Sequence, residues 1–332
     1  MLRIHFTDAD LARTRMAAEP DPLWEIGLSL SRFQTRQGRW AHAAWYRDTR
    51  QRLSETGLDR AVRTTLLPLF PRAAYYPDFL NPAEAADGLD AGLAAIVATP
   101  VERIRHEVEH FASIAAAPAW AGRLVERDVR EDLADCLRRY YDTAIAPYRE
   151  RAQARIDAER SIRARALLHG GTEALLRDLG PTMRWQAPVL HVVYPALDCD
   201  LHLGGRGLLL VPSYFCWGWP IALADPLLPP VLVYPLLHED PAPTDTAPLA
   251  VLLGRTRALV LRATAAGATT GELARTAGVS ASAASQHTTA LRDAGLISSY
   301  RHGTMVLHTL TPLGASLLRA AAKGRSVAAG HT

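Results

Sequence analysis

The stretch that decides the fold runs from Thr269 to Leu291 and reads TTGELARTAGVSASAASQHTTAL. A short helix, a glycine turn and a second helix capped by serine make up the plan of a helix-turn-helix. Gly278 suits the tight turn, because glycine adopts the left-handed backbone conformation without strain. We expect Thr270 to cap the first of these helices and Ser280 to cap the second.

The second helix of this stretch has two distinct faces. Helical spacing directs one set of side chains toward a core, namely Ala284, His287, Thr288 and Leu291. The opposite face carries short polar side chains and no acid, so it is able to enter the major groove of DNA and meet base edges and phosphates. Gly295 is expected to end the helix.

Two alternating runs follow the second helix and predict a hairpin. Leu296–Arg301 and Thr304–Leu310 read as strands joined around His302-Gly303, and Thr311-Pro312 begins a last helix. This hairpin is the wing of a winged helix, and a basic tip reaches phosphates or the minor groove. The residues that we expect to contact DNA are Thr270, Ser280, Ser282, Ala283, Ser285, Gln286, Thr289, Arg292, Arg301 and His302.

The charge of the chain is unevenly distributed. From Pro248 to Thr332 the sequence has nine Lys and Arg residues and two acids, Glu272 and Asp293, for a net charge of +7. The rest of the chain has 28 basic and 32 acidic residues, for a net charge of −4. Lys323 is the only lysine, which indicates an arginine-biased composition, so the scarcity of acids is the stronger argument for a polyanionic partner.

Residues from about 249 to 320 resemble the winged helices of ArsR-type bacterial transcription regulators. The matching features are Glu272-Leu273-Ala274, Gly278-Val279-Ser280, Ser285-x-His287, Leu291-Arg292-x-Ala294-Gly295-Leu296 and Thr311-Pro312-Leu313-Gly314. The resemblance implies a homodimer that binds a pseudo-palindromic operator in double-stranded DNA. Metal-responsive members carry a cysteine pair on the helix before the turn. Thr270–Ala277 has no cysteine, so metal sensing through that site is not expected.

The whole chain is also similar to actinobacterial regulators that carry a long N-terminal domain before this winged helix. The pieces that carry the similarity are Asp21–Glu25, Gly207–Ser213 and Asp225–Pro235. We expect an α+β fold, mostly α, with a mixed N-terminal domain over 1–240, a linker over 241–248 and a winged helix-turn-helix over 249–325. Short strands are expected near 2–6 and within 189–235.

The N-terminal domain begins with a strand over Leu2–Phe6, after which Thr7 or Asp8 caps a helix over Ala9–Met16. Asp21-Pro22 opens another helix, and the four prolines within Pro68–Pro82 predict an irregular connection. The pattern is helical over Pro100–Leu179.

Strand-like runs follow at Val189–Tyr194, Leu208–Val211 and Val231–Tyr234. Gly204–Gly207 is expected to form a hairpin turn between Cys199–Leu203 and the second of these runs, rather than a phosphate-binding loop.

Bulk properties favour a reduced cytoplasmic protein. The 332 residues suggest two domains, and 48% of them are apolar, which is enough for buried cores. The three cysteines, Cys136, Cys199 and Cys216, are widely spaced and odd in number. The N-terminus lacks a signal-peptide core, and no apolar run reaches the roughly 18 residues of a membrane helix. We therefore expect neither a membrane partner nor a disulfide.

His106-Glu107-Val108-Glu109-His110 matches the H-E-x-x-H motif of zinc proteases, in which the two histidines bind zinc and Glu107 acts as general base. Glu109 puts a charge between the ligands, Arg105 adjoins them, and no third ligand follows in a recognisable frame. A solvated helix face is the favoured interpretation. A zinc metalloprotease linked to a helix-turn-helix stays an alternative.

The densest aromatic patch runs from Tyr214 to Pro220. Tyr214, Trp217 and Trp219 are candidates for an effector pocket, although core packing is the favoured interpretation. The sequence thus predicts a regulator, without enzymatic activity, cofactor or bound metal, whose N-terminal domain answers to an unknown signal such as a small molecule. A winged helix that binds protein instead of DNA is a further alternative, against which the +7 charge argues.

Overall fold

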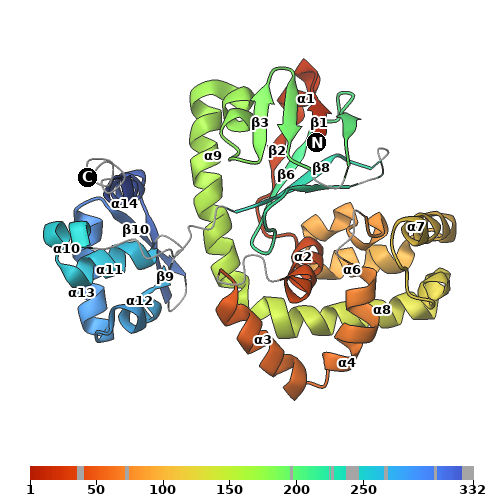
Figure 1. The fold of residues 1–332 in the computed structure, drawn as a ribbon, viewed down its shortest axis with the longest axis horizontal. Helices are drawn as coiled ribbons and strands as arrows, with labels where there is room; N and C mark the ends of the chain where they lie inside the picture. Colours follow the sequence, from red (N-terminus) through yellow and green to blue (C-terminus); the bar gives the residue numbers. More distant parts are fainter. Residues whose placement is uncertain are drawn as a thin grey trace, which may run out of the picture. The chain divides into compact units, whose positions relative to one another are not determined.

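The computed structural model describes residues 1–35, 41–71, 75–194, 197–223, 225, 228–236, 247–264, 268–302 and 305–323. The chain divides into two compact units, Met1–Leu237 and His238–Thr332 (Figure 1). Helices dominate and the sheets are small, as expected for a mostly helical α+β chain. Most of the linker expected over 241–248 lies outside the described residues, and Ala247 already begins a helix.

The first unit is built mainly from helices. Its α-helices are α1 (Asp8–Arg13), α2 (Pro22–Gln34), α3 (Ala43–Glu55), α4 (Asp59–Ala61), α5 (Leu67–Leu69), α6 (Leu89–Ala98), α7 (Val101–Ile114), α8 (Arg127–Tyr140) and α9 (Arg149–Arg177). π-helical turns at Val62–Leu66 and Tyr141–Ile145 and short 3-10 turns connect several of them. The predicted start of α2 is confirmed, since the Asp21 carboxylate accepts the amides of Leu23 and Trp24 at 3.0 and 3.1 Å.

Two four-stranded sheets complete the first unit. Their strands are β1 (Leu2–His5), β2 (Arg15–Met16), β3 (Met183–Gln186), β4 (Val189–Val192), β5 (Cys199–His202), β6 (Leu209–Ser213), β7 (Ile221–Ala222) and β8 (Val231–Pro235). One sheet has the order β3-β4-β1-β5 and the other the order β2-β6-β8-β7. Figure 1 shows α9 running from the helical part of this unit to the side of β3. The strands predicted at 2–6 and within 189–235 are confirmed.

The sheet β2-β6-β8-β7 is buried on both faces. Val211 and Val233 pack into the cluster formed by the helices, whereas Leu210 and Leu232 pack into a second cluster with the strands of the other sheet. Parallel pairing of β6 with β8 and burial on both sides explain why these strands read as continuous apolar runs.

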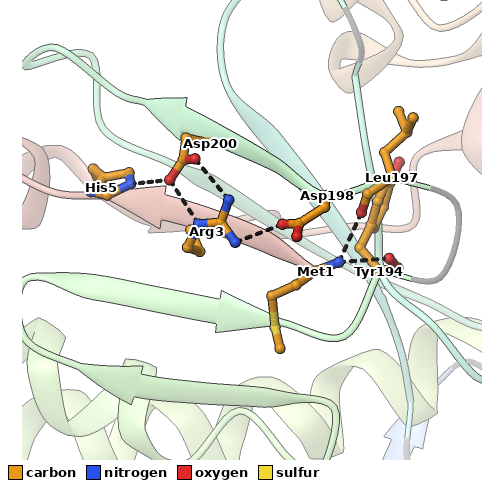
Figure 2. A network of polar contacts seen from close by, with 7 residues as sticks. All are labelled: Met1, Arg3, His5, Tyr194, Leu197, Asp198 and Asp200. Carbon is orange, nitrogen blue, oxygen red and sulfur yellow. Dashed lines mark hydrogen bonds and ion pairs between the residues drawn. The ribbon is translucent and has the colours of Figure 1, made fainter.

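The outer face of the sheet β3-β4-β1-β5 carries a polar network (Figure 2). Arg3 donates two hydrogen bonds to Asp200, at 2.8 and 2.9 Å, and one to Asp198 at 2.6 Å. Asp200 also pairs with His5 Nε2 at 2.7 Å, and these two partners, Arg3 first, lower the pKa of the Asp200 carboxyl. The amino group of Met1 donates to the carbonyl oxygens of Tyr194 and Leu197 at 3.0 and 2.8 Å. Side chains and backbone thus both join the first strand to the 194–200 segment.

The helix expected over Ala9–Met16 is shorter than predicted. It ends at Arg13, and β2 pairs in parallel with Leu209 and Leu210 of β6. The amide of Arg15 donates to the carbonyl of Leu208 at 3.0 Å. Residues 15 and 16, which were expected in the last helical turn, pair instead with a strand almost two hundred residues away. The spacing of apolar residues near Arg15 does not indicate this partner.

The glycine-rich segment Gly204–Gly207 does not form the expected hairpin turn. It connects β5 of one sheet to β6 of the other, and both strands pair in parallel with other strands. Gly207 has a φ of +75°, and its amide donates to the Asp10 carboxylate at 2.9 Å. A Cβ atom at this position would lie 2.6 Å from the Arg13 carbonyl oxygen, so the glycine allows the loop to pack directly on α1.

The second unit contains five helices in its described part, together with one small sheet. They are α10 (Ala247–Leu253), α11 (Arg255–Ala263), α12 (Thr270–Ala277), α13 (Ala281–Asp293) and α14 (Pro312–Lys323). The strands β9 (Ala268–Thr269), β10 (Ile297–His302) and β11 (Met305–Leu310) are ordered β10-β11-β9. The elements expected from Thr270 to the last helix follow one another in the predicted order, and Gly254 separates α10 from α11.

Across the described ranges of both units, no helix has the length and apolar character that crossing a membrane requires.

Candidate nucleic-acid interface

The helix α12 is capped one residue earlier than predicted. Thr269, not Thr270, is its N-cap, and its hydroxyl accepts the Glu272 amide at 3.3 Å. The Glu272 carboxylate in turn accepts the Thr269 amide at 2.9 Å, which completes a capping box. One of the two acids found from Pro248 onward is therefore occupied with the backbone of its own helix.

The turn between α12 and α13 forms as the sequence indicates. Gly278 adopts the left-handed conformation with a φ of +65°, and the Val279 amide donates to the Ala274 carbonyl at 3.0 Å. The Ser280 hydroxyl accepts the Ala283 amide at 3.2 Å and so caps α13. Both helices are held in place at the turn, which fixes the direction in which α13 projects.

The two predicted faces of α13 are present. Ala284, Thr288 and Leu291 are buried, and the Thr288 hydroxyl donates to the Ser285 carbonyl at 2.9 Å, so its polar group is satisfied inside the core. His287 and Ala283 are half-buried. The exposed face consists of Ser282, Ser285, Gln286, Thr289 and Arg292.

A buried histidine on β11, which was not among the predicted site residues, joins the hairpin to α12. His308 is 3% exposed; its Nε2 lies 3.0 Å from the Thr270 hydroxyl and its Nδ1 lies 2.8 Å from the Ser299 hydroxyl. Burial, together with the charge of Arg292, lowers the pKa of this imidazole. The side chain of Thr270 is therefore bonded within the unit instead of being directed to a ligand.

The alternation of residues along β11 indicates that His308 is buried, because residues two apart in a strand share one face. His308 alternates in step with Val306 and Leu310, which are partly buried. The identity of its two hydroxyl partners depends on the register of β10 and on the position of α12, neither of which is local information.

The hairpin β10-β11 pairs without interruption from Ile297 opposite Leu310 to His302 opposite Met305. β11 also pairs with β9, where Leu307 lies opposite Thr269. Arg301 and His302 are the last residues of β10, so their backbone lies at the end of the hairpin where the chain passes from β10 to β11. The side chains of these two candidates, and Gly303-Thr304 entirely, lie outside the described residues.

Basic side chains are exposed on several elements of the second unit. The exposed arginines of its described part include Arg255, Arg257, Arg262, Arg275 and Arg292. Asp293 lies 3.6 Å from the guanidinium of Arg292, and both side chains are at least half exposed, so this pairing is weak. The polar face of α13 thus lies in a basic unit with little competing negative charge.

The H-E-x-x-H motif on α7 serves the fold of the first unit. Glu107, the general base of the zinc hypothesis, is buried; it accepts the Phe79 amide at 2.7 Å and pairs with Arg103 at 2.6 Å. His106 and His110 are exposed, and the His110 ring packs against Tyr75. No group of three or more His, Cys, Asp or Glu side chains suited to a metal occurs in the part of the chain that is described.

The aromatic candidates for an effector pocket do not lie together on one cavity wall. Tyr214 is buried in the helical core, Trp217 is half-buried and Trp219 is 45% exposed. A neighbouring cleft is lined by Pro20, Pro22, Glu25, Tyr141, Ile145, Tyr148, Arg149, Ala152 and Phe215. Its volume of about 20 Å³ holds a single water molecule at most. The structure therefore gives no room for an effector there as it stands.

Glu25, which lines this cleft, has a structural role. Its carboxylate accepts the amides of Tyr214 and Phe215 at 2.8 and 3.1 Å. Burial raises the pKa of the Glu25 carboxyl to about 7. Glu25 does not stand out in the sequence, since an acid in the first turn of a helix is ordinarily a favourable partner of the helix dipole.

No family model matches this chain, and no curated protein or solved structure is similar to it. Its function is therefore inferred from its residues and their geometry alone.

Proposed function

We propose that the second unit binds double-stranded DNA and that the chain acts as a transcription regulator. The observation that carries this proposal is the exposed face of α13, which combines five polar or basic side chains, a single acid (Asp293 at the end of the helix) and a helix anchored at the glycine turn. A polyanion meets little repulsion on such a face, and short polar side chains let the helix approach base edges closely.

In this proposal α13 lies in the major groove. Ser282, Ser285 and Gln286 face the base edges, and an amide such as Gln286 pairs in bidentate fashion with adenine. Arg292, farther along the exposed face, meets the phosphate backbone. The end of the hairpin, with Arg301 and His302, contacts the flanking phosphates or the minor groove.

The role proposed for the first unit is to receive a signal, to hold two copies of the chain together, or both. Two copies would place two recognition helices on a two-fold operator, and a signal that changes their spacing would change the affinity for DNA. The free cysteines Cys136, Cys199 and Cys216 support a reducing, cytoplasmic setting.

The test is fluorescence anisotropy of the full chain with duplex DNA from upstream of its own gene, over a series of salt concentrations. Specific binding that weakens steeply with salt, and that a Gln286→Ala, Arg292→Ala double variant loses, is the expected result. Arg60→Ala, an exposed arginine of the first unit, is the matched control and should bind as the unchanged chain does. Binding of random and upstream duplexes with equal affinity would refute a sequence-specific role.

A further inference from the structure

The middle of α9 has an exposed face that the other described elements of the first unit do not cover. Leu168 is 84% exposed and Ile162 is 49% exposed, and both lie in the helical segment of α9 that precedes a kink at Gly170 and Gly171. The opposite side of the helix is firmly packed, because Glu159 and Arg163 are buried and form an ion pair at 2.7 Å. Arg163 also reaches Asp178 at 2.9 Å. The helix is therefore anchored along one side, and its exposed side is a defined face.

The residues on the centre of this face follow helical spacing. Ala158, Ser161, Arg165 and Leu168 succeed one another at intervals of three and four, and all four are exposed. Alanine and serine at the first two positions allow another helix to approach closely, while leucine at the fourth supplies a large apolar side chain. Asp157 flanks the small end, with 54% of its side chain exposed.

This face is complementary to the same face of a second copy whose helix runs in the opposite direction. In an antiparallel copy centred near residue 163, Leu168 of each helix meets Ala158 of the other. Arg165 then meets Ser161 and extends toward Asp157, which lies one turn farther along the partner helix. A two-fold pairing makes every contact twice, so each charge match and each apolar contact occurs at both ends of the interface.

We propose that the partner of this surface is a second copy of this chain, docked antiparallel along the α9 face formed by Ala158, Ser161, Arg165 and Leu168. The inference rests on the proposed function only insofar as a two-fold operator calls for a dimer. The contact itself requires no DNA. One helix pair of this length buries less than the roughly 1,600 Å² of a standard interface, so we expect association that depends on concentration.

The test is sedimentation velocity of the full chain without DNA over a wide range of concentration. The expected result is a monomer–dimer equilibrium that Leu168→Glu weakens roughly tenfold or more, because the charge would be buried against Ala158. Ile114→Glu is the control, since Ile114 is another exposed apolar residue, at the end of α7, and its substitution should leave the equilibrium unchanged. Far-ultraviolet circular dichroism of each variant verifies that the helices are retained.

A charge exchange distinguishes this pairing from any other. Asp157→Arg and Arg165→Asp should each weaken the dimer, and the double variant should restore it, because the two positions meet only between chains in the antiparallel register. A chain that is monomeric at every concentration, or a dimer insensitive to Leu168→Glu, overturns the proposal. So does failure of the double variant to recover association. DNA affinity is measured separately, so a dimer that does not bind DNA would refute the proposed function and leave this interface standing.

Discussion

The two units use carboxylates in opposite ways. In the first unit, buried acids accept backbone amides from distant segments: Asp10 from Gly207, Glu25 from Tyr214 and Phe215, and Glu107 from Phe79. In the second unit, Glu272 caps its own helix and Asp293 lies exposed at the end of α13.

A negative charge has different effects in the core of the first unit and on the surface of the second. A buried carboxylate that accepts amides replaces water around otherwise unpaired donors, so it joins segments that no sheet or helix connects. On a surface that meets a polyanion, the same group would repel the ligand. Buried acids therefore help to hold the first unit together, whereas the second unit contains only two acids from Pro248 onward. Substitutions in each unit test this difference between structural acids and an acid-poor surface.

The largest effect is expected for Glu107→Ala in the first unit. It leaves the buried Phe79 amide without an acceptor and removes the partner of Arg103, so we expect a loss of about 3 kcal/mol in the free energy of unfolding. Urea denaturation followed by tryptophan fluorescence measures it. His106→Ala, at an exposed position of the same motif, should change stability by less than about 0.5 kcal/mol. Equal losses in both variants, together with loss of bound zinc, would favour the metal hypothesis instead.

A smaller effect, of about 2 kcal/mol, is expected in the second unit for His308→Phe. The ring fits a strand, but the hydroxyls of Thr270 and Ser299 lose their partner in a buried site. Hydrogen exchange of the β10 and β11 amides reports this loss locally, since it resolves the two units. Unchanged exchange in β10 and β11 would show that the histidine network does not hold the hairpin.

The same histidine predicts a dependence on pH. Its pKa in the folded unit lies below the ordinary value of about 6.5, so the folded state disfavours the charged imidazole. The stability that the neutral ring contributes is present above that value and is lost as the pH falls toward the folded pKa. Hydrogen exchange in β10 and β11 should accelerate relative to the intrinsic trend below about pH 6.5 in the unchanged chain, and not in His308→Phe.

The sequence predicted best what local chemistry decides. Gly278, Ser280 and the spacing of Ala284 and Leu291 are enough to specify a turn between two helices, because each signal acts within one or two turns of chain. Even there the cap fell on Thr269 and not on Thr270, since both threonines precede Glu272 closely and only the backbone geometry selects one.

Long-range pairing is what the sequence could not supply. Leu2 pairs with Val192 on one side and with Cys199 on the other, and nothing near Leu2 indicates either partner. Gly204–Gly207 has the composition of a hairpin turn, yet it connects two sheets, because the choice depends on where β1 and β8 lie. The role of Glu107 was misjudged for the same reason: its motif is local, whereas its partner Phe79 is 28 residues away.

On the exposed face of α13, Gln286→Ala tests whether the second unit reads bases. If Gln286 reads a base, the variant loses about 1.5 kcal/mol of binding free energy on the preferred duplex and little on a duplex changed at the base it reads. Anisotropy titrations against a panel of single-base operator variants measure this. Thr289→Ala, a neighbouring exposed position with a shorter side chain, serves as the comparison. Equal weakening by Gln286→Ala on every duplex would assign this side chain to the backbone and not to the bases.

The smallest effect, and the most direct test of the acid-poor surface, is expected for Arg292. Arg292→Ala removes one contact with phosphate, so affinity should fall about equally on all duplexes and the slope of log affinity against log salt should flatten by about 1. Arg292→Glu places a second negative charge beside Asp293, so it should weaken binding further on every duplex, most of all at low salt where screening is least. Because Arg292 also contributes to the low pKa of His308, its removal should raise that pKa. A changed histidine titration without any change in salt slope would place Arg292 in the hairpin network alone, and would move the phosphate contact to another arginine of the unit.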